Sequence, residues 1–216
     1  GFMVLGAFDA MGVTLAQKMN DGKFVASSLR EDELFTFYRA DGVRDTLSTG
    51  KAPYPFRFQG IDDTSLKVKK RIFEYRLKYN GHNDKFVVCY CLNNLFEIYN
   101  SDGSLHKRII APYPYLVDTN HLSADKLGVP IDELIFTFKD CCLTDDRIFL
   151  LYNGSSPTGM IGAQSKIYVF DYEGNPIKYY LLDRYAHSFC IDKQGGVIYA
   201  LSDENDQKQV VRYSML

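Results

Sequence analysis

Residues 95–103 read Leu-Phe-Glu-Ile-Tyr-Asn-Ser-Asp-Gly, an alternating apolar run that ends in an Asp-Gly pair. Two other stretches share this pattern: Leu34-Phe-Thr-Phe-Tyr-Arg-Ala-Asp-Gly42 and Ile167-Tyr-Val-Phe-Asp-Tyr-Glu-Gly174. An acidic residue followed by Gly between alternating runs favours a β-hairpin, because Gly accepts the positive φ that such turns need. A second strand follows each turn, at residues 43–48, 104–110 and 175–182. The sequence therefore predicts three related hairpins.

Two further strands precede each hairpin, so the repeating unit has four strands. The strands directly before the hairpins, and a fourth copy, begin near residues 23, 85, 147 and 196. Still earlier strands lie near 14–17, 73–79, 136–143 and 188–192. Four-stranded units at intervals of about 62, 62 and 49 residues are typical of propeller blades. We expect an all-β protein, a β-propeller of four-stranded antiparallel blades, with about four blades near 14–48, 73–110, 136–182 and 187–216.

The composition excludes several classes of protein. The 25 Lys and Arg residues against 27 Asp and Glu give a net charge of −2, which does not favour nucleic-acid binding. No run of about 18 apolar residues exists, so no membrane-spanning helix is expected. The five cysteines lie in apolar runs without metal-site spacing, which predicts buried thiols; they are Cys89, Cys91, Cys141, Cys142 and Cys190. We expect no bound metal and no cofactor.

One stretch carries a family resemblance. Residues 188–203 read Ser-Phe-Cys-Ile-Asp-Lys-Gln-Gly-Gly-Val-Ile-Tyr-Ala-Leu-Ser-Asp and resemble an NHL-like or TolB-like blade, as does the hairpin at 167–182. The chain from 14 to 216 resembles the TolB-like six-bladed propeller proteins of Bacteroidetes-type bacteria, many of them uncharacterised lipoproteins. The resemblance implies export, to the periplasm or as an outer-membrane lipoprotein.

The number of blades leaves two interpretations of residues 1–216. Either they form one propeller domain, or they are a propeller fragment that lacks two blades of a six-bladed ring. The fourth unit stops after its third strand, at 209–216. The apolar residues 2–8 either complete that unit as its missing strand or form an element of their own.

The long connections between blades emerge on one side of the expected propeller. Two of them repeat a motif, Ala52-Pro-Tyr-Pro55 and Ala111-Pro-Tyr-Pro114. Loops on a rigid scaffold often carry the binding residues. The candidate ligand-binding residues on this side are Tyr54, Phe56, Tyr113, Tyr115, His121, Arg184, Tyr185 and His187. The alternative is that Pro-Tyr-Pro only fixes the crossover and packs its Tyr against the neighbouring blade.

No catalytic motif stands out, so the leading interpretation is a non-enzymatic binding module for a protein, peptide or glycan. The absence of Trp speaks against a glycan, since Trp offers the largest stacking face. The alternative is an enzyme, since some six-bladed propellers are lactonase-like hydrolases or lyases with a metal in the central channel. The expected inner strands offer Asp140, Asp192 and His187 for such a site. For His187 a structural, hydrogen-bonded role is the competing interpretation.

Overall fold

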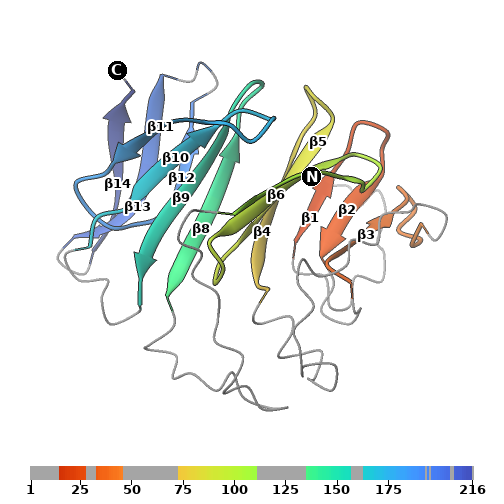
Figure 1. The fold of residues 1–216 in the computed structure, drawn as a ribbon, viewed down its shortest axis with the longest axis horizontal. Coiled ribbons are helices and arrows are strands. Elements are labelled where there is room, and N and C mark those ends of the chain that lie inside the picture. Colours follow the sequence, from red (N-terminus) through yellow and green to blue (C-terminus); the bar gives the residue numbers. More distant parts are fainter. Residues whose placement is uncertain are drawn as a thin grey trace, which may run out of the picture.

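The computed structural model describes residues 15–27, 33–45, 73–110, 135–156, 163–192, 194, 196–204 and 207–215. Every regular element in these ranges is a β-strand, and the strands form four antiparallel sheets, so the predicted all-β propeller architecture is confirmed (Figure 1). Within the same ranges no helix is long and apolar enough to cross a membrane.

The sheets follow one another along the chain, and within each sheet strands adjacent in sequence pair. The first sheet holds β1 (Ala16–Lys18), β2 (Phe24–Ser27) and β3 (Phe35–Tyr38). The second holds β4 (Tyr75–Asn80), β5 (Lys85–Tyr90), β6 (Leu95–Asn100) and β7 (Leu105–Ile110). The third holds β8 (Phe136–Leu143), β9 (Ile148–Ser155), β10 (Lys166–Phe170) and β11 (Pro176–Leu181). The fourth holds β12 (Ala186–Ile191), β13 (Val197–Glu204) and β14 (Gln207–Ser214).

The three acidic-Gly turns form where the sequence predicts them. Gly42, Gly103 and Gly174 have φ values of 80°, 86° and 78°, in the left-handed region that disfavours residues with a Cβ. After the first turn the structure describes residues 43–45 of the predicted strand, where Tyr38 and Arg44 form an isolated bridge, and residues 46–48 lie outside the described residues. The first sheet therefore has three described strands instead of four.

The first strand of each sheet is the innermost. β1 contacts β4, β4 contacts β8 and β8 contacts β12, so these strands line the axis around which the sheets fan out (Figure 1). Apolar clusters of described residues fill each space between neighbouring sheets. Between the first two sheets the rings of Phe35 and Phe86 meet edge to face at 4.9 Å, and Phe86 stacks on Tyr99 at 5.1 Å. The excess of Tyr and Phe in the sequence is thus used largely in packing sheet against sheet.

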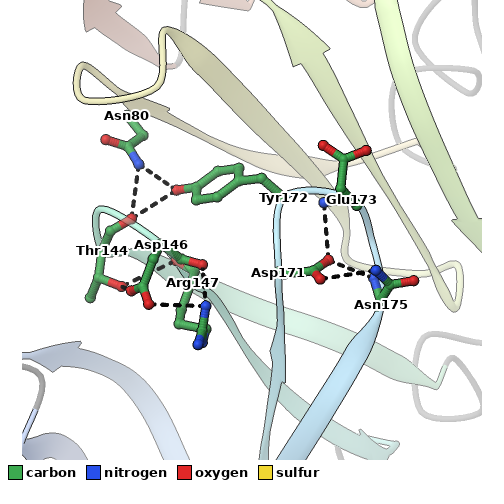
Figure 2. A network of polar contacts seen from close by, with 8 residues as sticks. All are labelled: Asn80, Thr144, Asp146, Arg147, Asp171, Tyr172, Glu173 and Asn175. Carbon is green, nitrogen blue, oxygen red and sulfur yellow. Dashed lines mark hydrogen bonds and ion pairs between the residues drawn. The ribbon is translucent and has the colours of Figure 1, made fainter.

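Polar contacts also join neighbouring sheets, on the side where the innermost strands end, here called the short-turn side. Figure 2 shows Asn80 at the end of β4 reaching the turn that precedes β9. Its Nδ2 donates to the Thr144 carbonyl at 2.8 Å and to the Tyr172 hydroxyl at 2.6 Å, and Tyr172 donates to the same carbonyl at 3.0 Å. Asn20 repeats the arrangement one sheet earlier, donating to the Gly81 carbonyl at 2.6 Å. These bonds tie neighbouring sheets together at their turns.

The five cysteines are free thiols. Cys89, Cys91 and Cys141 are buried, as the apolar runs predict, and Cys142 is half-buried. Cys190 is exposed, contrary to that prediction. Its β12 neighbours Phe189 and Ile191 pack toward the third sheet, so strand alternation turns Cys190 to the opposite face.

Candidate active site

A histidine and an aspartate meet on the side where the innermost strands begin and the second strands end, here called the long-loop side. Nε2 of His187, on β12, lies 2.6 Å from Oδ2 of Asp203, on β13. About a third of the His187 side chain and half of the Asp203 side chain are exposed, at 33% and 47%. The pair is therefore both well formed and open to solvent.

A β-bulge places His187 beside Asp203. Ala186 pairs with Ser202 and Ser188 pairs with Leu201, so His187 is an extra residue with no partner opposite. Strict alternation from Phe189 would point His187 into the apolar cluster between the third and fourth sheets. The bulge instead buries Ala186 in that cluster and leaves His187 on the face that carries Asp203. Bulges often redirect side chains next to active sites.

Tyr185 lies against the histidine. The two rings meet edge to face with centroids 5.0 Å apart, and the Ser202 hydroxyl donates to the Tyr185 carbonyl at 2.5 Å. Burial raises the pKa of Tyr185, so its hydroxyl stays protonated at neutral pH. That hydroxyl lies buried near the Asn153 side chain without a well-formed hydrogen bond. Tyr185 therefore packs edge to face against the imidazole ring of His187.

A buried polar network anchors the start of β12 to the third sheet. The Ser165 hydroxyl donates to Asn153 Oδ1 at 2.6 Å and accepts the Ala186 N–H at 2.8 Å. The Asn153 amide donates back to the Ala186 carbonyl at 3.3 Å. Each of these residues is buried. Because satisfied buried networks hold the backbone in one arrangement, this one positions the residue directly before His187.

Arg184, another predicted site residue, is paired with its own neighbour. Its Nε and Nη2 donate to the two carboxylate oxygens of Asp183 at 3.1 and 3.0 Å, and the Tyr213 hydroxyl donates to the same carboxylate at 2.5 Å. The Arg184 and Tyr213 hydrogen bonds lower the pKa of Asp183 to about 2. The structure thus brings Tyr185 and His187 together and occupies Arg184 in a local ion pair.

The other five predicted residues lie outside the described residues and remain predictions: Tyr54, Phe56, Tyr113, Tyr115 and His121. Asp203 was not among the predicted site residues. The signal in the sequence was its position directly after the Ile-Tyr-Ala-Leu-Ser strand, beside the strand of His187.

The three residues suggested for a channel metal do not converge. The Asp140 carboxylate accepts the N–H of Cys141 at 2.8 Å, and Asp192 accepts the N–H groups of Gly196 and Val197 in the turn before β13. His187 is paired with Asp203. In the part of the chain that the structure describes, no three His, Cys, Asp or Glu residues are grouped to hold an ion.

Comparison with known proteins identifies the fold. A family model described as TolB-like 6-blade propeller-like matches residues 8–194. A Bacteroides uniformis structure described as a candidate 6-phosphogluconolactonase is 13% identical, with a TM-score of 0.52 over 92% of this chain and 49% of that one. The Pseudomonas aeruginosa periplasmic gluconolactonase is 13% identical, with a TM-score of 0.54 over 92% of this chain and 49% of that one. The chain thus spans about half the length of these structures. No curated protein matches the sequence.

These findings correct the leading interpretation of the sequence. A non-enzymatic binding module was favoured because no catalytic motif was visible along the chain. The structures that share the fold are named as lactonases, and the long-loop side carries a His–Asp pair assembled from two strands. Such a pair leaves no sequence motif, since its members are sixteen residues apart and a bulge brings them together. The enzymatic alternative is therefore the better supported one.

Proposed function

The chain belongs to the TolB-like 6-blade propeller-like family, and from this premise we propose that it is part of a hydrolase that opens sugar lactones. The observation that carries the proposal is the 2.6 Å contact between His187 Nε2 and Asp203 Oδ2 in a half-exposed position. The names of the structurally similar lactonases suggest the substrate class.

Lactone hydrolysis needs a base that is held in place. A water oxygen bonds to the carbonyl carbon, the ring C–O bond breaks, and the water proton passes to the ring oxygen to give a hydroxy acid. In the proposed reaction Nδ1 of His187 takes that proton and then donates it to the ring oxygen. Among the described residues no hydrogen bond occupies Nδ1, whereas Nε2 is held by Asp203.

Asp203 and Tyr185 act through the histidine. The carboxylate of Asp203 fixes the tautomer and stabilises the imidazolium that forms when the water proton is taken. The edge-to-face ring of Tyr185 keeps the imidazole from rotating. Both residues are positioning residues in this proposal, and His187 is the proposed base.

The test is hydrolysis of glucono-δ-lactone and its 6-phosphate above the spontaneous rate, followed by base uptake at constant pH. We expect His187→Ala to lower kcat/KM by about 10²- to 10⁴-fold, the usual contribution of a general base. His82→Ala is the matched control, because His82 also faces an aspartate, Asp145 at 3.8 Å, but lies exposed on the short-turn side. Equal activity of the two variants would refute the role of His187.

We also propose a periplasmic location, with attachment as an outer-membrane lipoprotein as the more specific form. The family and the periplasmic gluconolactonase of similar fold support it. Fractionation of cells that express the full natural gene should release the protein with the periplasmic contents, or with the outer membrane if it is anchored. Recovery in the cytosolic fraction would contradict the proposal.

A further inference from the structure

The innermost strands carry a charge opposite to that of the whole chain. The chain has a net charge of −2, yet the strands that line the axis contain Lys18, Arg76, Lys78 and Lys139 against the single carboxylate of Asp140. Closely spaced cations on low-dielectric walls attract anions and raise their local concentration. The axis side of the described sheets is therefore suited to a negatively charged ligand.

Two of these cations project from β4 toward the third sheet. Tyr75 and Leu77 lie in the apolar cluster between the first and second sheets, and Tyr79 packs against it. Since side chains alternate along a strand, Arg76 and Lys78 point to the other face, toward β8, which contacts β4. Both side chains are half-buried.

Among the described residues Arg76 makes only a long ion pair, with Glu74, and Lys78 makes none. Arg76 Nη1 lies 3.6 Å from Glu74 Oε1, a long contact for an ion pair, and donates to the Tyr75 carbonyl at 3.3 Å. Lys78 makes no ion pair with any residue that the structure describes, although Asp140 lies within electrostatic range. A half-buried ammonium without a partner is unfavourable, and an anionic ligand would offset that penalty.

The Asp140 carboxylate does not form an ion pair with Arg76 or Lys78. Its carboxylate is directed to backbone donors, the N–H of Cys141 at 2.8 Å and the N–H of Phe189 at 3.4 Å. Burial raises the pKa of Asp140, whereas the nearby charges of Lys78 and Arg76 act to lower it. Lys139 is also directed away, because its ammonium lies over the Phe136 ring, 5.2 Å from the centroid.

We infer that Arg76 and Lys78 form a binding site for an anionic group, a phosphate or a carboxylate, carried by a sugar ligand that enters along the axis. The inference rests on the proposed function, since it makes the substrate a negatively charged lactone. It assigns substrate discrimination to residues on β4, apart from the proposed base on β12. The hydrolytic site and the anion site are thus separable by mutation.

The experiment uses ligands that contain no lactone, so binding is measured without hydrolysis. Glucose 6-phosphate, glucuronate and glucose are titrated into the chain by calorimetry at low and high salt. We expect one or both charged sugars to bind at least about tenfold more tightly than glucose, with affinity falling as salt rises. The comparison of phosphate with carboxylate identifies the preferred anion.

The variants locate the site. Lys78→Gln and Arg76→Gln, which remove the charge and keep a polar side chain, should each weaken binding of the charged sugar by about tenfold, and Lys78→Arg should restore it. Lys208→Gln is the matched control, because Lys208 is exposed on the outer strand β14. Unchanged affinity in Lys78→Gln and Arg76→Gln, or equal binding of glucose and the charged sugars, overturns the inference. Charged-sugar binding without lactone hydrolysis would instead refute the proposed function alone.

Discussion

His187 Nε2 and Asp203 Oδ2 lie 2.6 Å apart across β12 and β13, at the single residue that the bulge in β12 leaves without a cross-strand partner. The contact exists because one extra residue changes the face to which the histidine points. The geometry therefore links a local irregularity in strand pairing to the chemistry proposed for the long-loop side.

A buried carboxylate within the second sheet is expected to dominate the stability of that sheet. Glu97 has no exposed surface and accepts hydrogen bonds from the Tyr90 and Tyr99 hydroxyls at 2.6 and 2.7 Å and from Arg108 at 2.6 Å. Glu97→Ala leaves the buried Tyr90 and Tyr99 hydroxyls without their acceptor and the half-buried Arg108 without its partner, so it should lower the free energy of unfolding by about 3 to 5 kcal/mol. Urea denaturation measures this.

The control for that prediction is the exposed pair Arg39–Asp41, whose side chains are more than half exposed. Arg39→Ala should leave the urea midpoint nearly unchanged, because exposed ion pairs contribute little to stability. Similar losses for Glu97→Ala and Arg39→Ala would contradict the assignment of Glu97 as a buried anchor.

The contact between Asn80 and Thr144 is expected to hold the second and third sheets together. Asn80→Ala leaves the Thr144 carbonyl with one donor fewer and removes a donor to Tyr172, which should lower the free energy of unfolding by about 1 to 3 kcal/mol. Asn175→Ala is the comparison, since Asn175 bonds only to Asp171 in its own turn. A loss as large for Asn175→Ala would show that the contact between sheets is not the stabilising one.

Asp140 should make stability fall as the pH rises. Burial raises the pKa of Asp140 in the folded protein above its ordinary value of 3.8. Between the ordinary and the raised value the folded protein binds more protons than the unfolded one, so stability falls as the pH rises through that window. Asp140→Asn cannot bind this proton, so its stability should not show this decrease.

Thermal unfolding between about pH 4 and pH 7 tests the sign. The midpoint of the natural protein relative to Asp140→Asn should decrease across this range. A relative midpoint that increases with pH would show that Asp140 is stabilised as a carboxylate in the folded state. Because other carboxylates such as Asp183 contribute the opposite slope, only the difference between the two proteins is informative.

Most of the fold could be predicted from the repeated hairpins in the sequence. Acidic-Gly turns predict hairpins because the positive φ at Gly42, Gly103 and Gly174 is a local requirement that a single residue type meets. The strand boundaries followed from alternation, and β8 spans the predicted residues 136–143. The predicted fourth strand of the first sheet lies partly outside the described residues, which hold only the Tyr38–Arg44 bridge of its pairing.

The candidate site was only partly predictable, and for a physical reason. Tyr185 and His187 were placed on the long-loop side because strand order alone determines where β12 begins. The pairing with Asp203 depends on a bulge, and no residue type in the sequence marks a bulge without Gly. The anion-binding role inferred for Arg76 and Lys78 was likewise not predictable, because it depends on where the neighbouring strands direct their own charged groups.

The measurement that tests the central claim most directly is chemical rescue of a His187→Gly variant. Hydrolysis of a sugar lactone is followed at constant pH with and without added imidazole. If His187 is the base, the variant is nearly inactive, imidazole restores activity in proportion to its concentration, and His82→Gly shows neither effect. A His187→Gly variant that retains full activity, or one that imidazole does not rescue beyond the uncatalysed reaction, would contradict the account.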